Sequence, residues 1–280
     1  MNRPCLEKKR RIVIKVGSSS LAHKETGDLY LAKIEKMVRE ICDLRNSGID
    51  VCLVSSGAIA VGKQAMGLKT LDTKKHQKQA CAAIGQARLM MIYQRMFSEY
   101  NQNVAQILMT KNTMTIPNSR KNAKNTFDSL FNMGVIPIVN ENDTVSTYEM
   151  KFGDNDTLSA LVTTLIGGDL LVLLSDIDGM YTDDPNVNKD AQLIEYVANI
   201  TDDILAMGKN STGSNIGTGG METKLRAAQI STYAGADMII INSNDLNALH
   251  HLFDNSYRGT LFAKCPNSNF SLEEFLSKDE

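Results

Sequence analysis

The chain has 280 residues and a formal net charge of −2, with 30 basic and 32 acidic side chains. This balance provides no electrostatic basis for binding nucleic acid or an anionic membrane. Hydrophobic residues make up 42% of the sequence and charged residues 22%, which is ordinary for a soluble globular protein of one large α/β domain or two small ones. We interpret the basic cluster Lys8 to Arg11 as a solvated segment that leads into the first strand.

The five cysteines are scattered along the chain, and no two of them have the C-x-x-C spacing. Together with the four histidines they form no metal-ligand pattern. We therefore expect free thiols in a reducing compartment. The N-terminus lacks the apolar core of a signal peptide, and no apolar run approaches the ~18 residues of a membrane span. The sequence thus predicts a cytoplasmic protein.

Apolar segments with strand character alternate with segments of helical spacing. The first strand, residues 11–16, contains Lys15, a charge that is costly inside an apolar run unless it faces a functional edge. The small residues Gly17 to Ser20 follow, and such a turn lets backbone N–H groups approach a phosphate, although an ordinary β-turn has the same composition. Further helices are predicted over 28–47, 74–100 and 118–133, and further strands over 50–54, 104–109 and 135–139.

Residues 57–63 match the G-x-x-x-x-G-K spacing of a phosphate-binding P-loop. The next residue is Gln64 rather than the Ser or Thr that binds Mg²⁺, and the apolar residues between the glycines are typical of a core helix. We therefore reject the P-loop. Ser56 to Ala58 is interpreted as a strand-to-helix turn that offers N–H groups to an anionic substrate.

Three polar segments adjoin predicted strands or helices. Asn140 to Asp143 follows a strand, Gly153 to Asp156 precedes a helix predicted over 157–166, and Ser175 to Gly179 follows a strand predicted over 170–174. A strand without polar alternation is typical of a parallel sheet covered on both faces, where ligands bind at the carboxyl ends of the strands. We therefore expect these segments to form a functional edge; for the first of them a surface turn is the alternative.

Residues 211–220 are rich in Gly and Ser and precede a helix predicted over 221–234, with Lys224 in its first turn. This arrangement is typical of a phosphate site, although a flexible linker before a helix is the alternative. The remaining predicted elements are a loop over 186–199, a short helix over 202–207 and a strand over 237–242.

The alternation of strands and helices predicts an α/β fold with a mostly parallel sheet. The expected edge combines the lysines Lys15 and Lys224 with several carboxylates and amides. Phosphoryl transfer needs positive charge on the transferring group, N–H donors, and carboxylates that hold Mg²⁺ or position the lysines. Hydride transfer would need a dinucleotide fingerprint, which is missing, and no His near these turns suggests a Ser–His–Asp arrangement.

Five segments, in this order, resemble the motifs of the amino acid kinase family, and the resemblance extends from about Arg11 to Phe262. Two of the segments together are similar to the members that use ATP to phosphorylate the γ-carboxylate of L-glutamate, the first step of proline biosynthesis. The five segments are Lys15-Val16-Gly17-Ser18-Ser19, Ser55-Ser56-Gly57-Ala58, Asn140-Glu141-Asn142-Asp143, Gly153-Asp154-Asn155-Asp156 and Gly217-Thr218-Gly219-Gly220-Met221-Glu222-Thr223-Lys224, and the specific two are the third and the fifth.

The resemblance implies a three-layer αβα sandwich in a single domain over residues 1–280, with a glutamate-binding half over about 1–168 and an ATP-binding half over about 169–280. It implies ATP with Mg²⁺ but leaves the metal ligands unassigned. The implied catalytic residues are Lys15, Lys224 and Asp156; those for glutamate are Ser56, Gly57, Asn140, Asp143, Asp154 and Asn155; those for ATP are Lys15, Gly17, Ser175, Asp176, Thr218, Gly219, Gly220, Met221, Glu222, Thr223 and Lys224.

Asp156 has two interpretations. It either orients the two lysines, as the resemblance implies, or is the N-cap of the helix predicted from Thr157. Many of the similar members also carry a C-terminal PUA domain, and we expect none in this chain. A homo-oligomer, dimer or tetramer, and feedback inhibition by proline are expected. A kinase for another carboxylate or a nucleotide, and a ligand sensor without catalysis, are the alternative functions.

Overall fold

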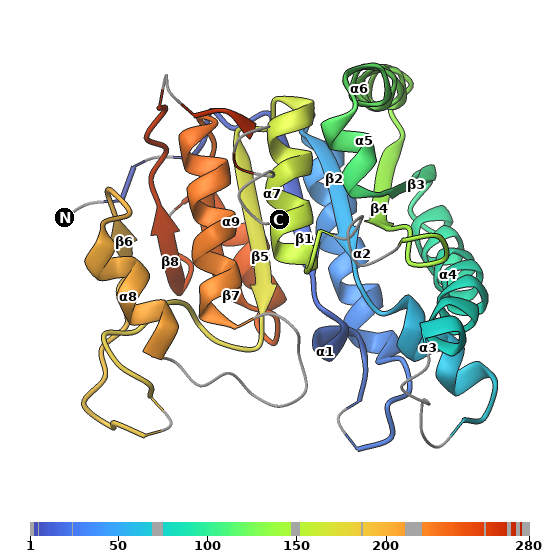
Figure 1. Cartoon of the computed structure of the whole chain (residues 1–280), viewed down its shortest axis with the longest axis horizontal. Coiled ribbons are helices and arrows are strands. Elements are labelled where there is room, and N and C mark those ends of the chain that lie inside the picture. Colours follow the sequence, from blue (N-terminus) through green and yellow to red (C-terminus); the bar gives the residue numbers. More distant parts are fainter. Residues whose placement is uncertain are drawn as a thin grey trace. The chain divides into compact units, whose positions relative to one another are not determined.

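A computed structural model describes residues 3–4, 6–23, 25–68, 75–146, 152–185, 187–210, 220–254, 256–267, 270–272 and 275 of the chain (Figure 1). The chain divides into two compact units: an N-terminal unit of residues 16–152, and a C-terminal unit that combines residues 1–15 with 153–280. Both contain parallel strands flanked by helices, so the predicted α/β class with a mostly parallel sheet is confirmed. The predicted division into a glutamate-binding half and an ATP-binding half near residue 168 stays a prediction.

Three parallel strands form the sheet of the N-terminal unit, in the order β3-β4-β2. They are β2 (Asp50–Ser55), β3 (Val104–Met109) and β4 (Ile136–Glu141). β4 continues beyond its predicted end to Asn140 and Glu141, because both residues are buried and pair with β3. The helices of this unit are α1 (Ser18–Leu21), α2 (Leu31–Asn46), α3 (Ala58–Ala65), α4 (Lys75–Ser98), α5 (Lys111–Thr115) and α6 (Pro117–Asn132).

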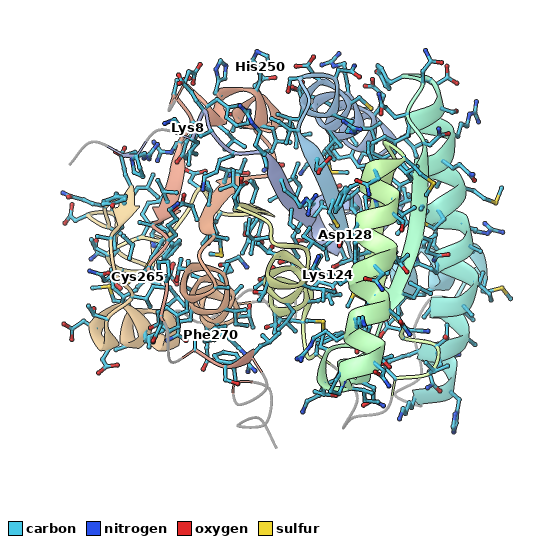
Figure 2. The ribbon with its side chains drawn as sticks, turned by 90° about the horizontal axis from the view of Figure 1, so that it is seen from above. Lys8, Lys124, Asp128, His250, Cys265 and Phe270 are labelled. Carbon is cyan, nitrogen blue, oxygen red and sulfur yellow. The ribbon has the colours of Figure 1, made fainter. Side chains whose placement is uncertain are left out.

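Glycines with left-handed backbone follow α2 and α6 close to the predicted helix ends. Gly48 has φ 89° and Gly134 has φ 74°, which other residues rarely adopt. Pro117 begins α6, where its missing N–H leaves no intrahelical bond unmade. Lys124 and Asp128 lie one turn apart on this helix and form an ion pair of 2.6 Å (Figure 2).

Two glycines allow α3 and α4 to pack backbone against backbone. A Cβ atom on Gly62 would lie 1.8 Å from the carbonyl oxygen of Cys81, and a Cβ atom on Gly85 would lie 1.8 Å from the carbonyl oxygen of Ala58. A larger residue at either position would have to displace backbone. Because α3 begins directly after the turn that ends β2, this contact also sets the position of α4 relative to that turn.

The sheet of the C-terminal unit has the strand order β1-β5-β7-β8-β6. β1 (Arg11–Val16) neighbours β5 (Leu170–Ser175), and β5 pairs in parallel with β7 (Asp237–Asn242) over its whole length. β8 (Gly259–Phe262) runs antiparallel to β7 and parallel to β6 (Tyr196–Val197). All six residues of β5 are buried, as its apolar sequence predicts.

Helices cover both faces of this sheet (Figure 2). α7 (Asn155–Ile166) and α9 (Met221–Tyr233) contact each other and pack on β5 and β7 respectively. The 3₁₀ helix η2 (Leu246–Leu252), which carries His250, lies on the opposite face. α8 (Asp202–Asn210) packs on α9. A sheet between two helical layers is the predicted three-layer αβα arrangement.

Lys9 is buried in the C-terminal unit, so the interpretation of the cluster Lys8 to Arg11 as solvated is wrong for Lys9, whereas Lys8 and Arg10 are exposed as predicted. Lys9 is buried, and its Nζ atom lies 2.5 Å from the carboxylate of Asp237 and 2.5 Å from the carbonyl oxygen of Asp169. Leu6 is fully buried, and Arg3 donates two hydrogen bonds to the backbone that leads into β8.

Sequence analysis missed the short elements of both units. β6 lies inside the predicted loop 186–199 and has only two residues. β8 begins with Gly259, a residue type depleted in strands. Glycine is required there because a Cβ atom would lie 2.4 Å from the carbonyl oxygen of Ile240. The short helices α1, α5 and η2 were also not predicted. None of the helices in the described ranges is long and apolar enough to cross a lipid bilayer.

The contact between α3 and α4 predicts that Gly85→Ala is strongly destabilising. Its Cβ atom would overlap the backbone of Ala58, so we expect a loss of about 3 kcal/mol in the free energy of unfolding, or no folded protein. Urea unfolding followed by circular dichroism measures this loss. Gly220→Ala is the matched control: its φ of −78° suits alanine, and no described atom lies near the added methyl group. Equal stability of the two variants would contradict the proposed packing.

Candidate active site

Three charged residues that the sequence places far apart meet in the C-terminal unit. Asp156 lies in the first turn of α7, Lys15 near the end of β1 and Lys224 in the first turn of α9. The Nζ atom of Lys15 is 2.5 Å from Oδ1 of Asp156, and the Nζ atom of Lys224 is 3.2 Å from Oδ2. The side chain of Asp156 is 1% exposed, and those of Lys15 and Lys224 are 12% and 7% exposed. We call these three residues the lysine–aspartate triad.

A neighbouring carboxylate caps α7 and thereby leaves Asp156 to the lysines. The side chain of Asp154 accepts hydrogen bonds from the backbone N–H of Thr157 at 2.8 Å and from its hydroxyl at 2.9 Å. Gly153 has φ 95°, so it makes the turn that brings Asp154 to the cap position. The interpretation of Asp156 as the N-cap is therefore wrong, and the helix begins at Asn155 instead of Thr157.

The hydroxyl of Thr223 also reaches the triad. It lies 3.2 Å from Oδ2 of Asp156 and 2.8 Å from the carbonyl oxygen of Gly220. Thr223 has one hydroxyl proton for these two acceptors and the shorter contact is to Gly220, so Lys224 provides the main link between the first turns of α9 and α7. The triad contains two ammonium groups and one carboxylate and so carries a net positive charge, and the carboxyl group of Asp154 is a further acidic neighbour.

The two lysines keep Asp156 ionised. Burial by itself would raise the pKa of this carboxyl group, but the charges of Lys15 and Lys224 and their hydrogen bonds outweigh burial and lower the pKa to about 2. Asp154 behaves differently: burial, followed by the nearby charge of Asp156, raises its pKa, against the hydrogen bonds from Thr157.

The carboxyl ends of β5 and β7 carry a second polar group in the same unit. Ser175 ends β5, and its hydroxyl donates to the exposed Asp176 at 3.2 Å. Asp178 accepts hydrogen bonds from Asn242 at 2.7 Å and from Arg258 at 2.8 Å. The hydrogen bond from Asn242, followed by that from Arg258, lowers the pKa of Asp178 despite its partial burial.

Sequence analysis did not single out Asn242 or Arg258. Asn242 could have been noticed as a polar residue at the end of a predicted strand, but nothing in the local sequence distinguishes Arg258. Their bonds to Asp178 hold the chain that follows Ser175.

The predicted ATP-binding residues are described only in part. Thr218 and Gly219 lie outside the described residues. Gly220 precedes α9 without a side-chain cap, and Met221, Glu222, Thr223 and Lys224 form the first turn of the helix. The first N–H groups of a helix have no partner within it and favour an anion. Gly17 of the N-terminal unit occupies the equivalent position before α1, a helix of one turn.

The remaining predicted residues of the N-terminal unit lie at the ends of β2 and β4. Gly57 has φ 104° and precedes α3, so the predicted strand-to-helix turn is present. Residues 58–65 form a helix rather than a phosphate-binding loop, which agrees with the rejection of the P-loop. The N–H of Ser56 donates to the carbonyl oxygen of Val16 at 3.1 Å and is not available to a substrate, which corrects that part of the prediction. Asn140 is buried, and Asp143 is partly exposed.

The structure thus brings together Lys15, Asp156 and Lys224, with Asp154 and Asn155 at the same helix start. It also places Ser56 and Gly57 beside Asn140 at neighbouring strand ends. Across the described ranges, no three His, Cys, Asp or Glu side chains are grouped as ligands of a metal ion.

Residues 10–242 match the model of the Amino acid kinase family. A glutamate 5-kinase of Clostridium acetobutylicum is 49% identical over 252 residues, which cover 90% of this chain and 94% of that protein. A glutamate 5-kinase of Carboxydothermus hydrogenoformans is 48% identical over 260 residues, which cover 93% of this chain and 69% of that protein. The chain belongs to the amino acid kinase family, among its glutamate 5-kinases.

The fold of this family is also found in solved structures of low sequence identity. Carbamate kinase from Giardia lamblia bound to AMP-PNP has a TM-score of 0.66 and 19% identity, and the alignment covers 93% of this chain and all of that one. At this identity the similarity concerns the fold. For this member of the amino acid kinase family, the roles of the individual site residues remain predictions.

The low pKa of Asp156 predicts how its contribution to stability depends on pH. The pKa is about 2 in the fold and about 3.9 in an unfolded chain, so the ionised carboxylate stabilises the fold above about pH 4. This contribution is lost as the pH falls through about 2. Asp156→Asn should therefore lower the free energy of unfolding by on the order of 2 kcal/mol at pH 7, and the difference from the wild type should shrink between about pH 4 and pH 2.

Urea unfolding at several pH values measures this difference. Asp128→Asn is the matched control, because Asp128 pairs with Lys124 on the surface and should contribute less than about 1 kcal/mol. The assigned ionisation would be contradicted if the loss in free energy of unfolding for Asp156→Asn stayed constant down to pH 2. It would also be contradicted if this loss were no larger than that of Asp128→Asn.

Proposed function

We propose that the protein transfers the γ-phosphoryl group of ATP to the γ-carboxylate of L-glutamate and forms γ-glutamyl phosphate, the first step of proline biosynthesis. The observation that carries this proposal is the lysine–aspartate triad, a buried site with net positive charge at the starts of α7 and α9. The similarity to glutamate 5-kinases supports glutamate as the acceptor.

The reaction needs no general base. A glutamate side chain titrates near ~4.3 and is already ionised at neutral pH. One of its carboxylate oxygens attacks the γ-phosphorus of ATP, the bond from that phosphorus to the bridging oxygen breaks, and ADP leaves with the bond electrons. No proton is transferred. The protein must bring two anions together and stabilise the charge on the transferring group.

Lys15 and Lys224 are suited to this task. Both are held in place by one carboxylate, so their ammonium groups can approach a single phosphoryl group without moving apart. Asp156 acts as a positioning residue, because it offsets their mutual repulsion and cancels only half of their charge. The first N–H groups of α9 add donors that favour the same anion.

ATP is proposed to bind along Gly17, Ser175, Asp176 and the segment 218–224. Bound together with ATP, Mg²⁺ would lower the repulsion between the phosphates of ATP and the glutamate carboxylate. Mg²⁺ in kinases takes most of its ligands from substrate phosphates and water, with one or two protein carboxylates. The donor set fits this mode, since Asp176 is an exposed carboxylate at the end of β5, whereas both oxygens of Asp156 already contact lysines.

Glutamate is proposed to bind Ser56, Gly57, Asn140 and Asp143 in the N-terminal unit, together with Asp154 and Asn155. The α-ammonium group of glutamate requires a carboxylate for recognition, and Asp143 is the candidate because it is partly exposed beside a buried strand end. The family resemblance further supports proline as a feedback inhibitor, a homo-oligomer (dimer or tetramer) and a cytoplasmic location.

The first functional prediction concerns the acceptor. With ATP, Mg²⁺ and hydroxylamine, the protein should form γ-glutamyl hydroxamate from L-glutamate. It should form little or no hydroxamate from aspartate or N-acetylglutamate, which have a shorter side chain or lack the α-ammonium group, and it should release no ADP with UMP. Activity with one of these three acceptors and none with glutamate would show that the protein is a kinase for another substrate. No activity with any acceptor would favour a sensor.

The second functional prediction separates the triad from the rejected P-loop. Lys224→Met should lower kcat at least ~10²-fold, because one preorganised charge on the transferring group is lost. Asp156→Asn should lower kcat to a similar extent while the KM values change little. Lys63→Met is the matched control and should leave kcat and the KM for ATP within about twofold. A large loss of kcat in the control, with an intact fold, would contradict the rejection of the P-loop.

A further inference from the structure

The N-terminal unit contains a buried polar network in which two members, Gln86 and Tyr93, have no role in the proposed reaction. Gln86 and Tyr93 lie two turns apart on one face of α4. The hydroxyl oxygen of Tyr93 is 2.8 Å from Oγ of Ser55, the last residue of β2. Oε1 of Gln86 accepts a hydrogen bond of 3.0 Å from Nδ2 of Asn140, near the end of β4. All four side chains are buried.

The direction of the hydrogen bond between Tyr93 and Ser55 can be assigned. The hydroxyl of Ser55 donates to the carbonyl oxygen of Ser56 at 3.1 Å. A serine hydroxyl has one proton, so Tyr93 must be the donor to Ser55. Tyr93 thus orients Ser55, and Ser55 orients the peptide group of Ser56.

The carboxamide of Asn140 is fixed at both ends. Its nitrogen donates to Gln86, and its oxygen accepts a hydrogen bond of 2.9 Å from the backbone N–H of Glu141. A flipped amide would place two donors against each other at Glu141 and two acceptors at Gln86. Gln86 therefore sets the side-chain orientation of Asn140 and, through it, the backbone that leads to Asp143.

The two strand ends lie at the same level of the sheet. The parallel register pairs Val54 with Val139, so Ser55 and Asn140 follow side by side. One face of α4 therefore supports both ends at once. The close contact at Gly85 prevents the helix from shifting relative to α3, which starts at the turn after β2.

We propose that Gln86 and Tyr93 are positioning residues for the acceptor substrate, because they hold in place the ends of β2 and β4 that bind it. This inference rests on the proposed function, in which Ser56, Asn140 and Asp143 bind glutamate. Neither Gln86 nor Tyr93 contacts the substrate. Their loss weakens binding of the acceptor and leaves binding of the nucleotide unchanged.

The test compares the KM values of two variants of α4 with those of a control variant beyond its end. Tyr93→Phe and Gln86→Met each remove one buried hydrogen bond, so the KM for glutamate should rise about three- to tenfold while the KM for ATP changes by less than about twofold. Tyr100→Phe is the matched control: it removes a phenolic hydroxyl that bonds to Glu35, away from the strand ends, and should leave both KM values unchanged.

A conservative variant separates positioning from general stability. Gln86→Glu keeps an acceptor oxygen for Asn140 in either protonation state and should recover much of the glutamate KM that Gln86→Met loses. A merely structural role would instead lower the melting temperature of these variants with no change in the KM for glutamate. An unchanged glutamate KM in both Tyr93→Phe and Gln86→Met overturns the proposal.

Amide hydrogen exchange provides a readout that does not depend on activity. Peptides that contain Ser56 should exchange faster in Tyr93→Phe, and peptides that contain Glu141 should exchange faster in Gln86→Met, than in the wild type or in Tyr100→Phe. If the wild-type protein phosphorylates another acceptor and not glutamate, the proposed function is refuted. The KM for that acceptor in the Tyr93→Phe and Gln86→Met variants then tests the positioning role. For an inactive wild type the exchange rates decide it, and unchanged rates at both peptides overturn it.

Discussion

The buried carboxylate of Asp156 imposes the constraint on which the candidate active site depends. A carboxylate that is almost fully removed from water is tolerated only where opposite charges and hydrogen bonds replace the solvent. Lys15 of β1, Lys224 of α9 and Thr223 of the same helix provide them. Because burying this charge is costly, the end of β1 and the first turns of α7 and α9 must lie close together around Asp156. The same constraint leaves one positive charge in excess, which is what an anionic substrate requires.

Two aspartates at the start of α7 have separate tasks. Asp154 accepts the N–H and hydroxyl of Thr157 and caps the helix, while Asp156 has turned inward to the lysines. A single acidic residue could not both cap the helix and bind the lysines, because the oxygens of a capping carboxylate accept hydrogen bonds from the first turn of its own helix. The positive φ of Gly153 allows this division, since it turns the chain so that Asp154, rather than Asp156, reaches the cap.

The predictable features were those whose cause lies in the local sequence. The apolar run of β5 and the positions of Lys15 and Lys224 could be recognised from their neighbours. Tertiary contacts decided the remainder. Sequence alone could not tell which aspartate caps α7, nor that the N–H of Ser56 is bound to Val16. Tyr93 was likewise hidden inside an ordinary helical pattern, because its partner lies on a strand far away in the chain. β8 was missed because it starts with a glycine, a residue type that weakens the sequence pattern of a strand but is sterically required here.

The ion pair of Lys9 with Asp237 has a consequence for the order in which the protein folds. Lys9 and Arg3 are synthesised before their partners, which lie in β7 and near β8, far later in the chain. The N-terminal unit is continuous in sequence and has all its strands before residue 153 is added. Closing a loop that spans most of the chain is entropically costly and slow. The ion pair of Lys9 with Asp237 can therefore form only after β7 has been synthesised, and the N-terminal unit can fold within the nascent chain before that.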